Sequence, residues 1–122
     1  FLKKNNSKII CISSIASDPR LESPIGYSVG KSALNHFIKC YSKYFKENKT
    51  FICGLLLGHT MHNNSVWKKK GKSIITKTLN STSIGRFIYP VEISSIIKQI
   101  LLQKNSLING SIINLEGGYT SI

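Results

Sequence analysis

The sequence predicts an α/β fold in which three parallel strands are covered by two long helices. Three apolar runs, Lys8–Ser13, Thr50–Leu57 and Ser111–Leu115, suit strands that are buried on both faces of a parallel sheet. Apolar residues recur every three to four positions near 27–47 and again near 91–103, which predicts two helices. We therefore expect the three strands to lie side by side in chain order, with the helices covering their faces.

The first strand leads through a loop into the clearest helix. Pro19 and Pro24 punctuate the loop, which spans Ile15–Gly26. In the helix that follows, Tyr27–Glu47, the lysines fall largely between the apolar positions. These apolar positions are Ala33, Leu34, Phe37, Ile38, Tyr41, Tyr44 and Phe45.

The second strand is followed by a segment that is harder to interpret. Gly58–Asn80 shows no clean periodicity, and neither a helix nor a strand is predicted there. Beyond it, Pro90 suits the first position of a helix, Val91–Gln103, and Asn109-Gly110 is a turn signal before the last strand.

Length and composition indicate one small domain or part of one. The chain has 122 residues, 41% of them hydrophobic, and no 18-residue apolar run that would suggest a membrane span. It begins at Phe1 without a methionine or a signal-peptide pattern, and we expect a chain that is interrupted upstream. The three cysteines, Cys11, Cys40 and Cys53, are scattered, and we expect buried, reduced thiols of a cytoplasmic protein.

The net charge of +12 is the main oddity of the composition. A surface for nucleic acid or an anionic membrane would explain it, and so would a general richness in lysine, asparagine and isoleucine. The lysines are mostly scattered singly, and only the segment Trp67–Lys72 contains a cluster. We therefore favour the compositional explanation and expect neither nucleic acid nor a membrane as a partner.

Three polar side chains could converge near the end of the first strand. The strand ends in Ser13-Ser14, and Tyr27 and Lys31 stand four positions apart at the start of the helix. Residues at this spacing share one helix face. A Tyr-x-x-x-Lys match is weak alone, because a packed tyrosine and a solvated lysine would produce it as well. A hydroxyl, a phenol and an ammonium at one spot would make a proton-transfer site, since a nearby ammonium favours the phenolate.

This segment resembles the catalytic segment of the short-chain dehydrogenases/reductases, of the classical type that includes 3-oxoacyl-ACP reductases. The resemblance rests on IICISSIAS, with Ser14 placed 13 residues before Tyr27, and on Tyr27-Ser-Val-Gly-Lys31. It continues in GRFIYPVEISSIIKQIL and NGSIINLEGGYTSI, which resemble the last helix and the last strand of the family. The resemblance covers nearly the whole chain but only the C-terminal half of the family's domain.

The resemblance implies a fold, a reaction and a set of site residues. Residues 1–122 would form the C-terminal catalytic half of a Rossmann-like, doubly wound parallel sheet. The activity would be NAD- or NADP-dependent reduction of a small-molecule carbonyl or oxidation of an alcohol, in a protein that is a homo-oligomer when complete. The catalytic residues would be Ser14, Tyr27 and Lys31, and the cofactor would be bound by Tyr27, Lys31, Gly58 and Thr60.

The sequence departs from the family pattern at several positions. Leu57 stands where the family has proline, Glu116 replaces an aspartate, and Thr60 lies closer to Gly58 than the family's threonine does. The Gly-rich turn, the Asn-Asn-Ala-Gly segment and the catalytic asparagine are absent from these residues. His59 and His62 have no third ligand at metal spacing, so we expect surface-loop histidines and no metal site.

An alternative from another functional class stays open. The chain would then be a non-catalytic basic module that kept the fold and binds an anionic partner through Lys68–Lys72. A Gly-rich nucleotide-binding turn encoded upstream in frame would favour the enzyme. In either case we expect the 122 residues alone to be inactive and to bind no nicotinamide cofactor tightly, because no Gly-rich turn that opens a helix is present.

Overall fold

The three predicted strands form one parallel sheet. The computed structural model describes residues 7–44, 50–103 and 107–120. Strands β1 (Lys8–Ser14), β2 (Phe51–Leu57) and β3 (Ile112–Leu115) lie in the order β1-β2-β3, and both pairings are parallel. The predicted strand order and direction are therefore confirmed, and the strand bounds differ by one residue at most.

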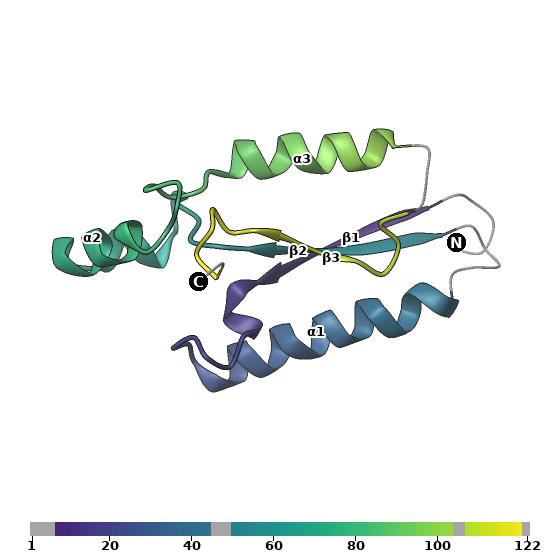
Figure 1. The fold of residues 1–122 in the computed structure, drawn as a ribbon, viewed down its shortest axis with the longest axis horizontal. Helices are drawn as coiled ribbons and strands as arrows, with labels where there is room; N and C mark the ends of the chain where they lie inside the picture. Colours follow the sequence, from purple (N-terminus) through teal and green to yellow (C-terminus); the bar gives the residue numbers. More distant parts are fainter. Residues whose placement is uncertain (1–6, 45–49, 104–106, 121–122) are drawn as a thin grey trace.

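Two helices cover opposite faces of the sheet, as predicted (Figure 1). Helix α1 (Ile25–Tyr44) lies on one face and helix α3 (Pro90–Leu102) on the other, which gives a three-layer α/β arrangement. Helix α1 begins two residues earlier than predicted, and its predicted end at Glu47 lies outside the described residues.

Strand β2 is the centre of the core because it is buried from both faces. Cys53 and Leu55 are fully buried and pack with Ile93 and Ile100 of α3. The opposite face of β2 presents Gly54 toward α1, where an added Cβ would lie 2.8 Å from the Cδ1 atom of Ile38. Glycine at position 54 therefore lets α1 pack closely on the sheet.

Both ends of α3 are tied to other parts of the chain. At its C-terminus, the Lys8 ammonium donates hydrogen bonds to the carbonyls of Ile100 (3.1 Å), Leu101 (2.8 Å) and Gln103. The last carbonyls of a helix have no following turn to donate to them, so a side-chain donor stabilises this end, and a cation also suits the negative end of the helix dipole. At the N-terminus, Glu92 accepts a 2.8 Å hydrogen bond from the amide of Tyr89.

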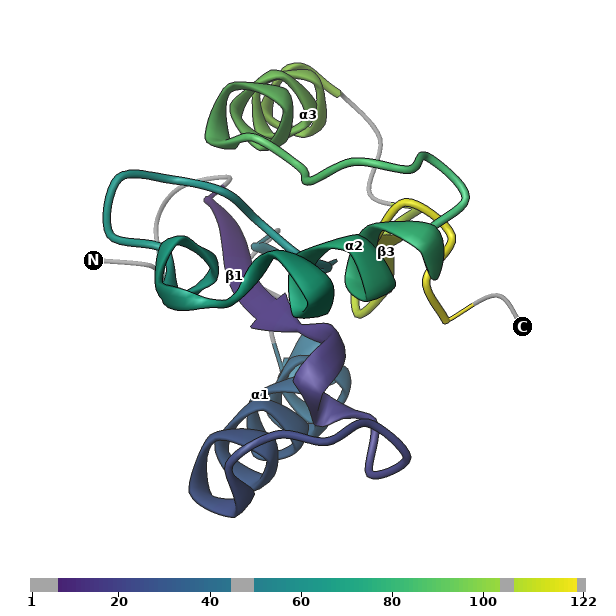
Figure 2. The same cartoon turned by 90° about the vertical axis from the view of Figure 1, so that its left-hand side faces the viewer.

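A third helix, α2 (Lys72–Asn80), follows the 3₁₀ turn η2 (Val66–Lys69) in the segment without periodicity. Figure 2 shows α2 running across the carboxyl ends of the strands, between α1 and α3. The sequence did not predict it because the helix is short, has Gly71 at its N-cap with no side-chain cap, and half exposes Ile74.

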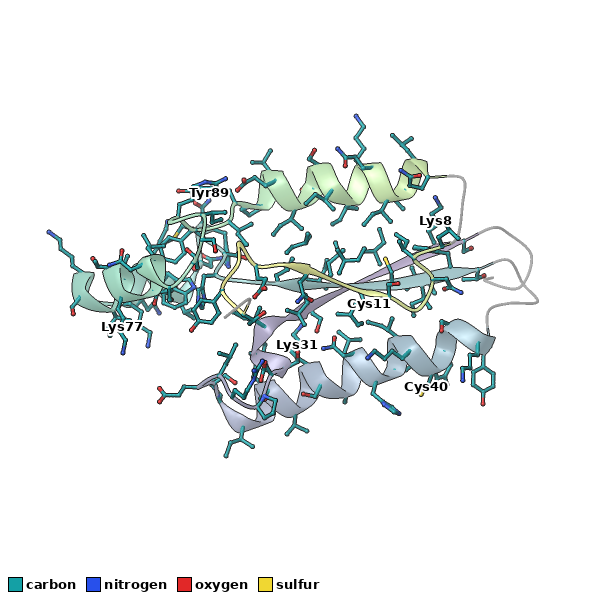
Figure 3. The ribbon with its side chains drawn as sticks, in the orientation of Figure 1. Lys8, Cys11, Lys31, Cys40, Lys77 and Tyr89 are labelled. Atoms are coloured by element: carbon teal, nitrogen blue, oxygen red, sulfur yellow. The ribbon has the colours of Figure 1, made fainter. Side chains whose placement is uncertain are left out.

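The cysteines are free, but not all of them are buried. Cys53 is buried, Cys11 is intermediate and Cys40 is exposed. The expectation of a buried thiol was therefore wrong for Cys40, whose Sγ lies 3.3 Å from His36 Nε2 on the outer side of α1 (Figure 3). Within residues 7–44, 50–103 and 107–120, no helix is long and apolar enough to cross a membrane.

Candidate active site at the carboxyl ends of the strands

All three strands end at the same level of the sheet. Ser14 is in register with Leu57, and Leu57 is in register with Leu115, so the chain leaves the sheet at one edge in three places. A cavity of about 700 Å³ opens there, in the position where parallel α/β sheets bind ligands. Its lining includes Ser14, Tyr27, Gly58, His59, Trp67 and Tyr119.

Ser14 is the last residue of β1 and also the N-cap of the 3₁₀ turn η1 (Ile15–Ser17). Its Oγ accepts a 3.2 Å hydrogen bond from the Ala16 amide, and its carbonyl accepts one of 2.8 Å from the Ser17 hydroxyl. The hydroxyl oxygen of Ser14 is thereby held in place by the Ala16 amide. Its proton has no acceptor within the described residues. The hydroxyl can therefore donate to a ligand in the cavity.

Tyr27 lies in the first turn of α1, and half of its surface is exposed. Lys31 follows one helical turn later, with its Nζ 5.6 Å from the centroid of the Tyr27 ring. Figure 3 shows Lys31 on the side of α1 that faces β1, where its ammonium donates a 2.8 Å hydrogen bond to the carbonyl of Ile12. Ser14 and Tyr27 line the cavity, whereas Lys31 does not and lies near the Tyr27 ring.

Gly58 is held close to the backbone that follows β3. Its amide donates a 2.9 Å hydrogen bond to the Leu115 carbonyl, and an added Cβ would lie 2.7 Å from the Cα of Glu116. The Gly58 amide is thus already used, although the residue lines the cavity. Thr60 is not in the cavity lining, and its hydroxyl donates to the Gly58 carbonyl at 3.1 Å.

His59 is not the surface-loop histidine that the sequence suggested. Its ring makes edge contacts with Trp67 and Tyr119, at centroid distances of 4.8 and 4.5 Å. Its Nε2 is buried and has no hydrogen-bond partner among the residues that the structure describes. Burial lowers the pKa of His59, and the charge of Glu116 opposes this shift only in part. Tyr119 is distant in sequence and Trp67 lies in the segment without periodicity, so no local pattern could have revealed these contacts.

The remaining histidine of this segment is exposed, as expected. His62 Nδ1 accepts a 3.3 Å hydrogen bond from the Asn64 amide. Among the residues that the structure describes, no three histidine, cysteine, aspartate or glutamate side chains come together as metal ligands would.

Glu116 begins the turn that brings Tyr119 back to the cavity. The carboxylate is buried, and its Oε2 accepts a 2.8 Å hydrogen bond from the Thr120 amide. Gly117 and Gly118 have φ values of 66° and 77°, which residues with a side chain rarely adopt. The Glu116 side chain therefore bonds across the turn and holds it closed.

Comparison with family models and with curated proteins finds no match. Solved structures do match, among them three at 20% identity or lower. A 4-hydroxyisoleucine dehydrogenase complexed with NADH has a TM-score of 0.83 at 20% identity, over 94% of this chain and 47% of that chain. The angucycline C-6 ketoreductase LanV with bound NADP has a TM-score of 0.85 at 16% identity, over 98% of this chain and 46% of that chain. A short-chain dehydrogenase/reductase from Serratia marcescens has a TM-score of 0.82 at 18% identity, over 96% of this chain and 47% of that chain.

These similarities confirm the predicted fold. The chain has a Rossmann-like α/β fold that is also found in short-chain dehydrogenases/reductases, and it spans about half the length of the solved structures that it matches.

Proposed function

We propose that these residues are the catalytic half of an NAD- or NADP-dependent oxidoreductase of the short-chain dehydrogenase/reductase type. The protein would reduce a carbonyl or oxidise an alcohol on a small molecule. The observation that carries the proposal is that Ser14 and Tyr27, from different elements, line one cavity, while the Lys31 ammonium lies 5.6 Å from the Tyr27 ring. The neighbours that were crystallised with NADH and NADP support the choice of cofactor.

Each of the three residues has a distinct role in this proposal. Ser14 donates its free proton to the substrate oxygen and stabilises the charge that develops there. Tyr27 transfers a proton to or from the same oxygen as general acid or base. Lys31 supplies the positive charge that favours the phenolate, and its bond to Ile12 keeps the ammonium in place.

The residues present fit the nicotinamide end of the cofactor in part. Among the residues that the structure describes, Ile12 is the acceptor for one of the three N–H groups of Lys31, so the others can bond a ribose hydroxyl beside the Tyr27 phenol. Gly58 would offer its surface but not its amide, and Thr60 would have to release the Gly58 carbonyl. When bound, the nicotinamide supplies or accepts the hydride.

Several attributes of the whole protein belong to the same proposal. Its cofactor-binding half would lie outside these residues, and the free thiols suit the cytoplasm. We also propose a homo-oligomer built on α1, where Phe37 and Tyr41 stack at 4.2 Å while both stay partly exposed.

The second candidate, a basic module that binds an anionic partner, is favoured by one observation. Lys68, Lys69 and Lys72 are exposed and do not line the cavity, so they are free to face a partner. A module of this kind would bind its partner equally well after loss of the Tyr27 hydroxyl.

The replacement Tyr27→Phe tests the enzyme proposal in the full-length product of the gene. It removes only the transferable proton, so turnover should fall about 10²–10⁴-fold while the Kd of the cofactor stays nearly constant. Tyr44→Phe is the matched control, because Tyr44 ends α1, is 74% exposed and lies outside the cavity lining. Near-normal kcat in Tyr27→Phe would refute the assignment.

The isolated chain of 122 residues provides a second test. Titration with NADH and with NADPH, followed by fluorescence, should show no micromolar binding, because the pyrophosphate would find no Gly-rich turn at a helix N-terminus. Micromolar binding would show that this half holds the cofactor by itself.

A further inference from the structure

The cavity has two basic side chains that the proposed reaction does not use. Lys70, which ends the turn η2, and Lys77, in the last turn of α2, both line it. They belong to the segment between β2 and α3, whereas Ser14 is the last residue of β1 and Tyr27 lies in the first turn of α1. The cavity thus has a catalytic wall and a separate basic wall.

The charge of these lysines is not neutralised by the surrounding residues. A third cation in the lining, Arg20, donates to both carboxylate oxygens of Asp18, at 3.0 and 2.6 Å. The ion pairs recorded within the described residues, Arg20–Asp18 and Arg86–Glu92, involve neither lysine. Glu22 is the one acidic residue of the lining, so the cavity has an excess of positive charge.

The rest of the lining includes aromatic and aliphatic side chains. Trp67, Ile74 and Tyr119 are among them, together with the ring of His59, whose pKa is lowered by burial. Such a surface binds an uncharged carbon chain, and Lys70 and Lys77, although exposed themselves, can attract an anion carried by that chain.

We propose that the substrate carries an oxyanion, a carboxylate or a phosphate, that Lys70 and Lys77 bind while its carbonyl or alcohol lies at Ser14 and Tyr27. This inference rests on the proposed function, because it names the substrate class of the same site. The neighbouring lysines Lys68, Lys69 and Lys72 do not line the cavity, so recognition is assigned to two specific residues and not to the lysine cluster as a whole.

Binding of matched charged and neutral ligands to the full-length protein tests the inference. The carboxylate arm compares acetoacetate, 4-oxopentanoate and 5-oxohexanoate with their methyl esters. The phosphate arm compares dihydroxyacetone phosphate with dihydroxyacetone. Calorimetric titration, with and without NAD or NADP, should show that at least one anion binds about 10-fold or more tightly than its neutral counterpart. This size follows from the greater strength of hydrogen bonds to charged groups. This preference should weaken between 0.05 and 0.5 M salt.

Three replacements decide which lysines are responsible. Lys70→Met and Lys77→Met should each reduce the preference for the anion several-fold and leave the affinity for the neutral ligand nearly unchanged. Lys72→Met is the matched control, because Lys72 is exposed on the same helix α2 and outside the lining. Equal binding of every anion and its neutral counterpart would overturn the inference, and so would a preference that survives both cavity variants.

The failure of this inference can be separated from the failure of the proposed function. Tyr27→Phe should retain the full preference for the anion while turnover is lost. If Tyr27→Phe stays active but the anion preference depends on Lys70 and Lys77, the catalytic assignment is wrong and the anion site stands. If Tyr27→Phe is inactive and no anion is preferred, the catalytic assignment stands and the anion site is wrong.

Discussion

The ammonium of Lys31 donates a 2.8 Å hydrogen bond to the backbone carbonyl of Ile12, two residues before the end of β1. This bond joins α1 to the strand that carries Ser14. It also places a fixed positive charge near the Tyr27 ring, although Lys31 lies outside the cavity lining. The site therefore depends on the contact between a helix and a strand edge as much as on the residues inside the cavity.

Lys31→Ala should impair both catalysis and cofactor affinity. It removes the charge beside Tyr27 and the proposed donor to the ribose, so kcat should fall by at least about 10²-fold and the cofactor Kd should rise. Steady-state kinetics and a cofactor titration of the full-length protein would measure the two effects. In Lys39→Ala, a control on the same helix at an exposed position, neither should change. A normal cofactor Kd in Lys31→Ala would contradict the ribose contact.

Gly58→Ala should destabilise the fold near the cavity. The added Cβ would lie 2.7 Å from the Cα of Glu116, and backbone cannot move aside as a flexible side chain can. We expect a loss of about 1–3 kcal/mol in the free energy of unfolding, measured by urea denaturation. Gly30→Ala is the control in the interior of α1, where an added Cβ meets nothing within 4 Å. This variant should gain about 0.5–1 kcal/mol. Equal stabilities of the two variants would contradict the close approach.

Acidification should destabilise the protein through His59. Burial lowers the pKa of this histidine in the folded state, so below the unfolded value of about 6.5 the unfolded chain binds more protons. Stability should therefore be full above about pH 6.5 and fall as the pH drops from there toward the folded pKa. Unfolding midpoints between pH 7.5 and 5 should change less in His59→Gln than in the parent. His62→Gln, at an exposed position, should retain the full pH dependence.

The complete protein should self-associate through α1. Phe37 and Tyr41 are stacked and each is 42% exposed, and Tyr44 is 74% exposed, so this helix presents aromatic surface away from the core. Light scattering should give a mass of at least two subunits, and Phe37→Lys should shift the protein toward the monomer. A monodisperse monomer for the unaltered protein would rule out this contact.

The sequence was informative wherever structure is encoded locally. The apolar run at Lys8–Ser14 and the stripe that includes Ile38 each lie within one element, so β1 and α1 could be predicted from spacing alone. The position of His59 could not, because its ring contacts Tyr119, which follows β3 and is distant in sequence, as well as Trp67 in a segment without periodicity.

The proximity of Tyr27 and Lys31 was predictable for the same reason, and the position of Lys77 was not. Tyr27 and Lys31 are one helical turn apart, so their proximity follows from helix geometry. Lys77 reaches the cavity because α2 crosses the strand ends, and the segment that forms this helix shows no clean periodicity. The roles proposed for Ser14 and Tyr27 come from the resemblance to a family, because spacing alone leaves them open.

The shared level at which the strands end also bears on how the protein folds. Ser14, Leu57 and Leu115 become neighbours only through parallel pairings between segments far apart in the chain, and such pairings require long loops to close first. No part of the cavity can be complete in a partly paired intermediate. Recovery of ligand binding after dilution from denaturant should therefore lag behind the helical circular-dichroism signal of α1, and its rate would report the closing of the β2–β3 pairing.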